Sequence, residues 1–154
     1  MNLGPNFTLT SMLHSAKADE LGITAQYNPP KDVLDNLQVL VTKCLQPLRD
    51  KLGKPINISS GYRCPDVNKA IGGVSNSQHQ FGQAADTEVN GMTTEEWFQW
   101  VLASGIEFDQ LIQEFNNWVH ISYNEGHNRR EIFRATMVDG KAVYTPVTHT
   151  SWPT

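Results

Sequence analysis

Two of the five histidines stand where they could bind a metal ion. His79 and Asp86 lie seven residues apart in one segment, and His120 lies further along, within residues 118–122. Two nitrogen ligands and one oxygen ligand, with a fourth position left for water, are the usual set of a catalytic zinc ion. Such an ion lowers the pKa of its water from about 15.7 to about 7 and polarises a scissile carbonyl. These residues therefore predict hydrolysis at a zinc site.

The spacing by itself leaves a second interpretation open. A surface histidine near an aspartate is common, and a histidine on a strand is more often structural than a ligand. His14 and His149 lack partners at a useful spacing, so neither is a candidate ligand. The prediction depends on elements that would bring the three side chains together.

Apolar periodicity predicts helices in the first third of the chain. Residues 8–21 fit a helix with Thr10 or Ser11 as its N-cap. The clearest helix runs over about residues 32–52, where apolar residues recur every three or four positions. Pro47 lies inside this helix and should kink or split it, because proline removes a backbone donor and clashes one turn back.

Strands dominate the rest of the chain. Residues 55–63 alternate in polarity, which predicts a half-buried strand whose polar face ends in Arg63. The other predicted elements are a helix over 65–70, a strand over 84–89, a helix over 93–105 with a capping box at Thr93, strands over 108–115 and 118–123, and a hairpin of 133–138 with 142–145. Helices that precede a mostly antiparallel sheet indicate the α+β class.

Composition excludes several classes of function. The 154 residues suit one domain, and a net charge of −4 without a basic stripe argues against binding to nucleic acid. No apolar run of eighteen residues is present, so we expect no membrane span, and residues 1–6 do not resemble a signal peptide. We therefore expect a monomer that is cytoplasmic or released at lysis. Cys44 and Cys64 are expected to be free thiols, with a single bridge as the alternative.

Several motifs occur together in a fixed order. They are Ser59-Ser60-Gly61-Tyr62-Arg63, Gly72-Gly73, Ser77-x-His79-x-x-Gly82-x-Ala84-x-Asp86 and Trp118-Val119-His120-Ile121-Ser122. In this respect the chain resembles the zinc D-alanyl-D-alanine peptidases, a group that includes VanX- and VanY-type enzymes, several phage endolysins and the related Hedgehog signalling fold. The resemblance spans about residues 7–123.

The resemblance implies a fold in which helices pack on a small, mostly antiparallel sheet that carries the zinc. It implies His79, Asp86 and His120 as the ligands and peptidoglycan peptide stems as the substrate. Gly82 and Ala84 are small, and we expect this to leave room for the chain to turn back onto the metal. Two neutral imidazoles and one carboxylate would leave the site with a net charge of +1, which strengthens its Lewis acidity.

Two further residues match positions that contact substrate in the family. Arg63 could bind a substrate carbonyl or terminal carboxylate and stabilise the developing oxyanion, or it could be a surface arginine paired with an acid such as Asp66. Ser77 could contact substrate or could be a local turn residue.

The general base does not follow directly from the family pattern. Many members carry an acid three residues before the last histidine ligand, where this chain has Asn117. We predict Glu114 as the base if the following turn has an odd number of residues, which places Glu114 opposite Trp118 and on the face of His120. Glu88, on the strand of Asp86, is the alternative.

Two classes of function are consistent with these residues. The first is a zinc peptidase with a helical part over 8–52, a catalytic core over 55–123 and a hairpin over 131–146, which cuts either a terminal D-Ala-D-Ala bond or an internal L-Ala–D-Glu bond. The lack of a long insertion that could form a lid favours an open groove and the internal bond. The second is a binding module of the same fold that contains zinc but does not catalyse a reaction. This alternative remains open because Asn117 stands where many family members have an acid.

Overall fold

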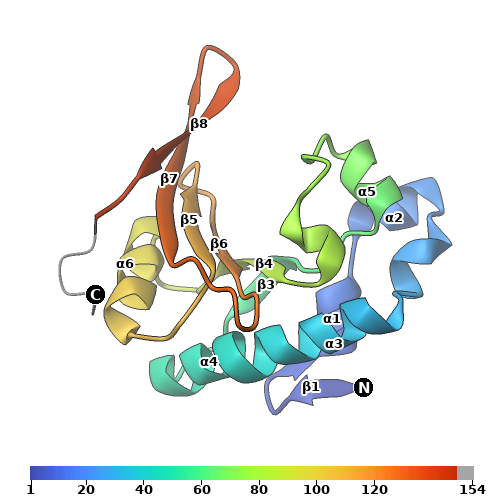
Figure 1. Ribbon diagram of the computed structural model, residues 1–154, viewed down its shortest axis with the longest axis horizontal. Helices are drawn as coiled ribbons and strands as arrows, with labels where there is room; N and C mark the ends of the chain where they lie inside the picture. The colour runs from blue at the N-terminus through green and yellow to red at the C-terminus, as the bar shows by residue number, and fades with distance from the viewer. Residues whose placement is uncertain (149–154) are drawn as a thin grey trace.

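A six-stranded sheet lies at the centre of the computed structural model, which describes residues 1–148 (Figure 1). Its order is β3-β4-β6-β5-β7-β8. The strands are β3 Asn57–Ser60, β4 Ala84–Glu88, β5 Gln110–Glu114, β6 Trp118–Ser122, β7 Glu131–Val138 and β8 Lys141–Pro146. Neighbours pair antiparallel except β5 and β7, which are parallel. The predicted α+β class with a mostly antiparallel sheet is confirmed. His149 lies outside the described residues.

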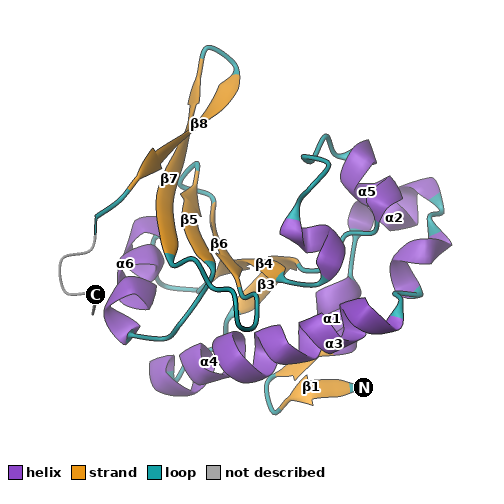
Figure 2. Ribbon diagram, in the orientation of Figure 1, coloured by secondary structure: helices purple, strands orange, loops and turns teal. Residues whose placement is uncertain are grey.

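Helices lie on either side of the sheet and below it, and the β7–β8 hairpin extends beyond them (Figure 2). They are α1 Leu9–Leu13, α2 Ala16–Leu21, α3 Lys31–Leu40, α4 Gln46–Leu52, α5 Pro65–Ala70 and α6 Thr94–Ser104, with 3-10 turns η1 Thr24–Tyr27 and η3 Gln78–Phe81 and a π-helical segment η2 Val41–Leu45. A short ribbon, β1 Asn2–Gly4 with β2 Phe7–Thr8, precedes them. The predicted helix over 65–70 and the Thr93–Glu96 capping box are both confirmed.

The long helix passes through its proline without ending. α3, η2 and α4 run on as one rod below the sheet (Figure 1). In η2 the N–H of Gln46 donates to the carbonyl of Val41, five residues earlier, so the ladder changes register just before Pro47. A widened π turn is a common way to accommodate a disrupted hydrogen-bond ladder. The helix is therefore not split at Pro47: it continues through the proline, and the interruption is a change of helix type over Val41–Leu45.

The prediction of one helix over residues 8–21 is wrong. Thr8 and Ser15 each act as an N-cap: the Thr8 hydroxyl accepts from the N–H of Ser11, and the Ser15 hydroxyl accepts from the N–H of Ala18, each at 3.1 Å. Two caps begin two short helices, α1 and α2, so Thr10 and Ser11 lie within the first helix and do not cap it. The side chains of Thr8 and Ser15 compete with a continuous helical ladder.

One face of the sheet packs into the core, and the other carries the candidate site. One face carries buried residues and packs on α6, where the Trp97 indole donates to Thr87 Oγ1 at 2.8 Å. These core residues are Ala85, Leu111, Val119, Ile121 and Ile132. On the other face, the paired register places Asp86, His120, Ile112 and Phe133 in one row across the strands and Trp118, Glu114, Ala135 and Tyr144 in the next. The second face therefore holds the candidate site.

Two other predictions can be compared with the structure. Cys44 and Cys64 are both buried free thiols, as expected. The hairpin of β7 and β8 turns at Asp139 and Gly140, both with positive φ, which is the conformation of a two-residue hairpin turn. No helix within residues 1–148 is long and apolar enough to cross a membrane.

Candidate metal centre

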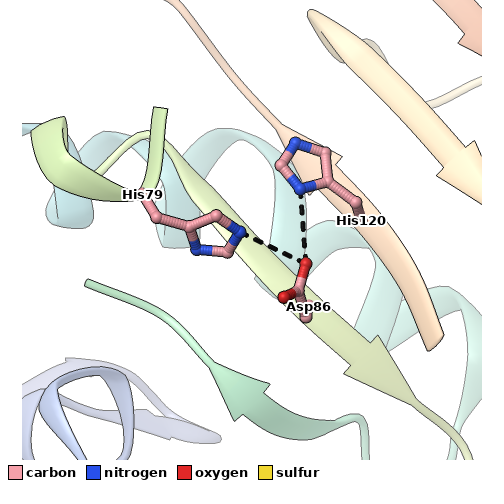
Figure 3. Close-up of side chains that lie close together, drawn as sticks. All are labelled: His79, Asp86 and His120. Atoms are coloured by element: carbon pink, nitrogen blue, oxygen red, sulfur yellow. Dashed lines mark hydrogen bonds and ion pairs between the residues drawn. The ribbon is translucent and has the colours of Figure 1, made fainter. Parts of the chain in front are cut away.

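His79, Asp86 and His120 converge on one point (Figure 3). Asp86 Oδ1 lies 3.2 Å from His79 Nε2 and 3.3 Å from His120 Nδ1, and one ligand atom from each residue falls within 4.8 Å of the others. The two rings meet at 69° with centroids 5.1 Å apart, so they approach the carboxylate from different directions. All three residues are buried. The fold thus brings together the predicted ligand set.

His79 is held by its own turn and by the end of β3. η3 begins after Ser77, whose hydroxyl accepts from the N–H of His79 at 3.3 Å. His79 Nδ1 lies 2.7 Å from the carbonyl of Gly61, which must receive the ring proton and leaves Nε2 as the free lone pair. Gly61 lies close to α1: a Cβ there would stand 2.4 Å from the Met12 carbonyl. Glycine therefore allows the close approach that puts this acceptor behind His79.

Asp86 and His120 are set by the sheet itself. They are direct partners in the antiparallel pair of β4 and β6, and their side chains therefore project from the same face. Asp86 is 7% exposed. Burial raises its pKa, but the facing imidazoles of His79 and His120 lower it by more, so the pKa lies below the usual range. The carboxylate is therefore ionised.

Gly82 serves a different purpose from the one expected. It ends η3 with a φ of +72°, and a Cβ there would stand 2.7 Å from the Val33 carbonyl of α3. Glycine is required by this left-handed turn and by the close contact with the long helix. Gly82 thus allows the turn that carries His79 to pack closely against α3.

The donor set fits zinc. Two imidazole nitrogens and one ionised carboxylate oxygen are the ligands of many catalytic zinc sites. His79 has the second-sphere acceptor that usually orients such a ligand, the carbonyl of Gly61 at 2.7 Å. Burial of the triad limits the competition of bulk water for the ligands.

Glu114 faces the metal centre because of the loop that follows it. The loop between β5 and β6 has three residues, two of which, Phe115 and Asn116, have φ near +60°. Glu114 is therefore paired with Trp118, as the odd-numbered turn requires. Glu114 Oε1 lies 3.8 Å from His120 Nδ1 and accepts from the Trp118 indole N–H at 2.9 Å. The geometry meets the condition set for Glu114 as the base, and the role stays a prediction.

Glu88, the alternative base, lies elsewhere. It is exposed and lines a separate hollow of ≈ 290 Å³ formed by Thr87–Thr94 and Trp97. This hollow contains none of the three predicted ligands. The position of Glu88 favours Glu114.

Arg63 and Ser77 lie together beside His79. The predicted strand ends earlier than expected, at Ser60, and Ser59 is an extra residue that shifts its pairing with β4. Arg63 is instead held by its own N–H, which donates to the His79 carbonyl at 3.0 Å. Its guanidinium donates to Ser77 Oγ at 3.5 Å. Burial lowers the pKa of Arg63, and the carboxylates of Asp86 and Glu114 raise it by less.

These side chains line one cleft of ≈ 620 Å³. Its walls include the three predicted ligands, Arg63, Ser77 and Glu114, together with Gly72, Gly73, Val74, Asn76, Gln78, Gln110, Ile112, Trp118, Arg129, Phe133, Ala142 and Tyr144. The cleft is large enough for a peptide of a few residues.

Sequence reasoning missed the network around Asp109. Its side chain is fully buried and accepts from Arg129 Nε and Nη2 at 2.9 Å each, and from Gln78 Nε2 at 2.7 Å. Its own N–H donates to the Ser122 carbonyl. Asp109 thus links the turn of His79 to the strand of His120. The available signal was an acid between Phe108 and the apolar strand that follows, since a carboxylate buried at such a place needs partners.

Two comparisons relate the chain to known proteins. A family model described as Peptidase M15 matches residues 5–122, a range that includes the three predicted ligands, Arg63, Ser77 and Glu114. The chain is also 46% identical over 43 residues to a zinc D-Ala-D-Ala carboxypeptidase of Streptomyces albus G. That alignment covers 27% of this chain and 17% of the relative, so the chain spans less than a fifth of the relative's length.

Proposed function

The chain belongs to the peptidase M15 family, and from this premise we propose that it is a zinc-dependent peptidase that hydrolyses D-amino-acid-containing peptide stems of bacterial peptidoglycan. The observation that carries the proposal is the buried triad with a carboxylate beside it: Glu114 Oε1 lies 3.8 Å from His120 Nδ1 in the same cleft. The relative named as a zinc D-Ala-D-Ala carboxypeptidase supports the metal and the class of substrate.

His79 Nε2, Asp86 Oδ1 and His120 Nδ1 would hold the zinc ion. When bound, zinc supplies a Lewis acid for the scissile carbonyl and acidifies a water molecule. Glu114 accepts a proton from the attacking water and passes it to the departing amine. The Trp118 indole holds one oxygen of Glu114, so the carboxylate keeps its orientation toward the triad.

Arg63 acts from the other side of the triad. Its guanidinium donates a hydrogen bond to the substrate carbonyl and stabilises the charge that develops on that oxygen. Ser77 Oγ contacts both the guanidinium, at 3.5 Å, and the N–H of His79, at 3.3 Å. Ser77 therefore aligns Arg63 with the ligand turn and faces the substrate in the cleft.

The proposal covers two scissile bonds. A carboxypeptidase needs a cation for the terminal carboxylate, and Arg63 is the cation beside the triad. Arg129 also lines the cleft but is already paired with Asp109 and Glu131. An endopeptidase needs a groove that accepts chain on both sides of the bond. We favour the internal bond, because the loop of Gly72–Ser77 and the β7–β8 hairpin both line the cleft with the triad, which leaves surface on either side for the substrate chain.

The test is digestion of purified peptidoglycan with the zinc-loaded chain, followed by mass spectrometry of the products. New amino termini within the stem indicate an endopeptidase, and released D-alanine indicates a carboxypeptidase. Glu114→Gln should lower turnover at least about 100-fold while zinc content stays the same. Glu88→Gln is the matched control and should leave both unchanged.

A non-catalytic module gives a different set of results. In that case the wild-type chain binds one zinc ion and releases no product, and Glu114→Gln changes nothing. A chain that retains no zinc after dialysis against metal-free buffer would remove the metal centre and the peptidase proposal together.

A further inference from the structure

The C-terminal hairpin contributes to the cleft although it lies outside the family match. The Peptidase M15 model matches residues 5–122, whereas β7 and β8 span Glu131–Val138 and Lys141–Pro146. Phe133, Ala142 and Tyr144 of this hairpin nevertheless line the cleft with the metal ligands. The hairpin joins the sheet through the parallel pairing of β7 with β5, the strand of Glu114. Part of the cleft wall therefore comes from residues beyond the matched range.

Register places Tyr144 near the predicted base. Glu114 pairs with Ala135 of β7, and Ala135 pairs with Tyr144 of β8, so the three side chains project from the same face. Adjacent strands are about 4.8 Å apart, which puts the Cα atoms of Glu114 and Tyr144 about 10 Å apart. The residue between them is an alanine, so its methyl group leaves space above the sheet. Tyr144 can extend into that space toward Glu114.

Phe133 and Tyr144 form an aromatic surface that is partly exposed to solvent. Phe133 and Tyr144 make an edge-to-face contact with centroids 6.5 Å apart and rings at 87°. Tyr144 keeps 48% of its surface exposed. Tyr144 lines the same cleft as Glu114 and Asp86, and burial, followed by the negative charges of these two carboxylates, raises the pKa of its phenol. The ring is supported on one side and free on the side that faces the cleft.

We propose that the β7–β8 hairpin forms a substrate subsite in which Phe133 and Tyr144 bind an apolar side chain next to the two residues that the scissile bond joins. This inference rests on the proposed function and names the side-chain chemistry that the site accepts. The surface that faces the ligand is formed by Phe133, Tyr144, Ala142 and Ile112. An acidic side chain there would meet the negative field of Glu114, and its desolvation would not be compensated. Aromatic rings contribute large apolar area at fixed positions.

The test measures binding and does not require cleavage. The probes are two series of phosphinate pseudopeptides, one with a D-Ala-D-Ala core and one with an L-Ala–D-Glu core, in which the phosphinate replaces the scissile bond. Each carries one extra residue, leucine, glutamate or lysine, on one side or the other. Titration calorimetry with the zinc-loaded full chain gives Kd. We expect a preference of about 10-fold for leucine over glutamate on one side of the core and less on the other.

Variants connect that preference to the hairpin. Tyr144→Ala should reduce it to below about 2-fold, and Tyr144→Phe should retain it, because the ring stays in place. Val143→Ala is the matched control: Val143 is the preceding residue of β8, its side chain projects from the opposite face, and the preference should not change. Ala142→Lys should reverse the order in favour of glutamate, since it places a cation in the proposed subsite.

Two outcomes overturn the subsite in different ways. Equal binding of all probes by the wild-type chain, with no response to Ala142→Lys, removes the subsite and leaves the peptidase proposal intact. Failure of every phosphinate to bind the zinc-loaded chain removes both, because the probes then find no accessible metal.

Discussion

The indole N–H of Trp118 donates a 2.9 Å hydrogen bond to Glu114 Oε1. The two residues are direct partners at the end of the β5–β6 pair, and Trp118 lies two positions before His120 on the same face. The bond therefore fixes the predicted base relative to a predicted metal ligand. Without it, the carboxylate could rotate away from the attacking water.

Trp118→Phe keeps the ring in the cleft and removes the donor. We expect kcat on peptidoglycan fragments to fall about 10-fold, because a charge-assisted hydrogen bond contributes about 1.5–3 kcal/mol to the position of its acceptor. Zinc content should stay at that of the wild type. Steady-state kinetics with elemental analysis checks both, and an unchanged kcat would show that Glu114 needs no such support.

His120→Ala removes one of the three ligands. Zinc affinity, measured by competition with a chelator, should fall at least about 100-fold, and added zinc should no longer raise the melting temperature. His14→Ala is the control, since His14 is exposed at the end of α1 and far from the triad in the sequence. Full zinc retention by His120→Ala would exclude His120 from the site.

Asp109→Asn keeps the shape of the buried side chain and removes its charge. Bonds from Arg129 and Gln78 to the carboxylate then weaken, and we expect a loss of about 1.5–3 kcal/mol in the free energy of unfolding at neutral pH. Zinc affinity should fall about 10-fold, because the turn of His79 loses its link to the strand of His120. Gln78→Leu should reproduce the loss of affinity with a smaller loss of stability.

The Asp109 network should also make stability depend on pH. Burial raises the pKa of Asp109, but the hydrogen bonds from Arg129 and Gln78 lower it by more, so the folded-state pKa lies below the ordinary value. The unfolded state therefore takes up the proton first as pH falls. The contribution is complete above about pH 4–5 and is lost as pH falls through the folded pKa. The stability difference between wild type and Asp109→Asn, followed by urea unfolding, should shrink as the pH is lowered below about 4.

The two thiols should be protected from reagents in the folded chain. Burial raises the pKa of Cys44 to about 12, and Cys64 is 2% exposed. Thiolate is the reactive form, so a thiol reagent at pH 8 should label almost nothing in the native protein and both residues in denaturant. Rapid labelling of the native chain would show that the helix of Cys44 opens readily.

The sequence predicted most of the elements near the site because their signals are local. The capping box of Thr93, the proline that opens the helix at 65–70 and the Asp139–Gly140 turn are each contained within a few residues. The N-terminal helix was wrong because Thr8 and Ser15 are both good caps, and periodicity alone does not show which cap begins a helix. The family resemblance, and not the spacing of His79 and Asp86, identified the ligand set.

What sequence reasoning could not supply depends on distant partners. Asp109 needs Gln78, 31 residues earlier, and Arg129, 20 residues later, and no local pattern joins them. The position of Tyr144 depends on the parallel pairing of β7 with β5, which follows from tertiary packing. The orientation of Glu114 depends on the length of one turn, and this turn has three residues, of which Phe115 and Asn116 are left-handed.

The register of β4 against β6 determines the metal site as well as the pairing of the sheet. Asp86 and His120 face each other across that ladder, so a slip by one residue would swing one of them into the hydrophobic interior while leaving the count of backbone hydrogen bonds nearly unchanged. A chain with this register shift could be compact and soluble yet unable to chelate an ion. Chelation would stabilise only the native register and not the shifted one. A cation present during refolding would therefore favour correct pairing of β4 with β6.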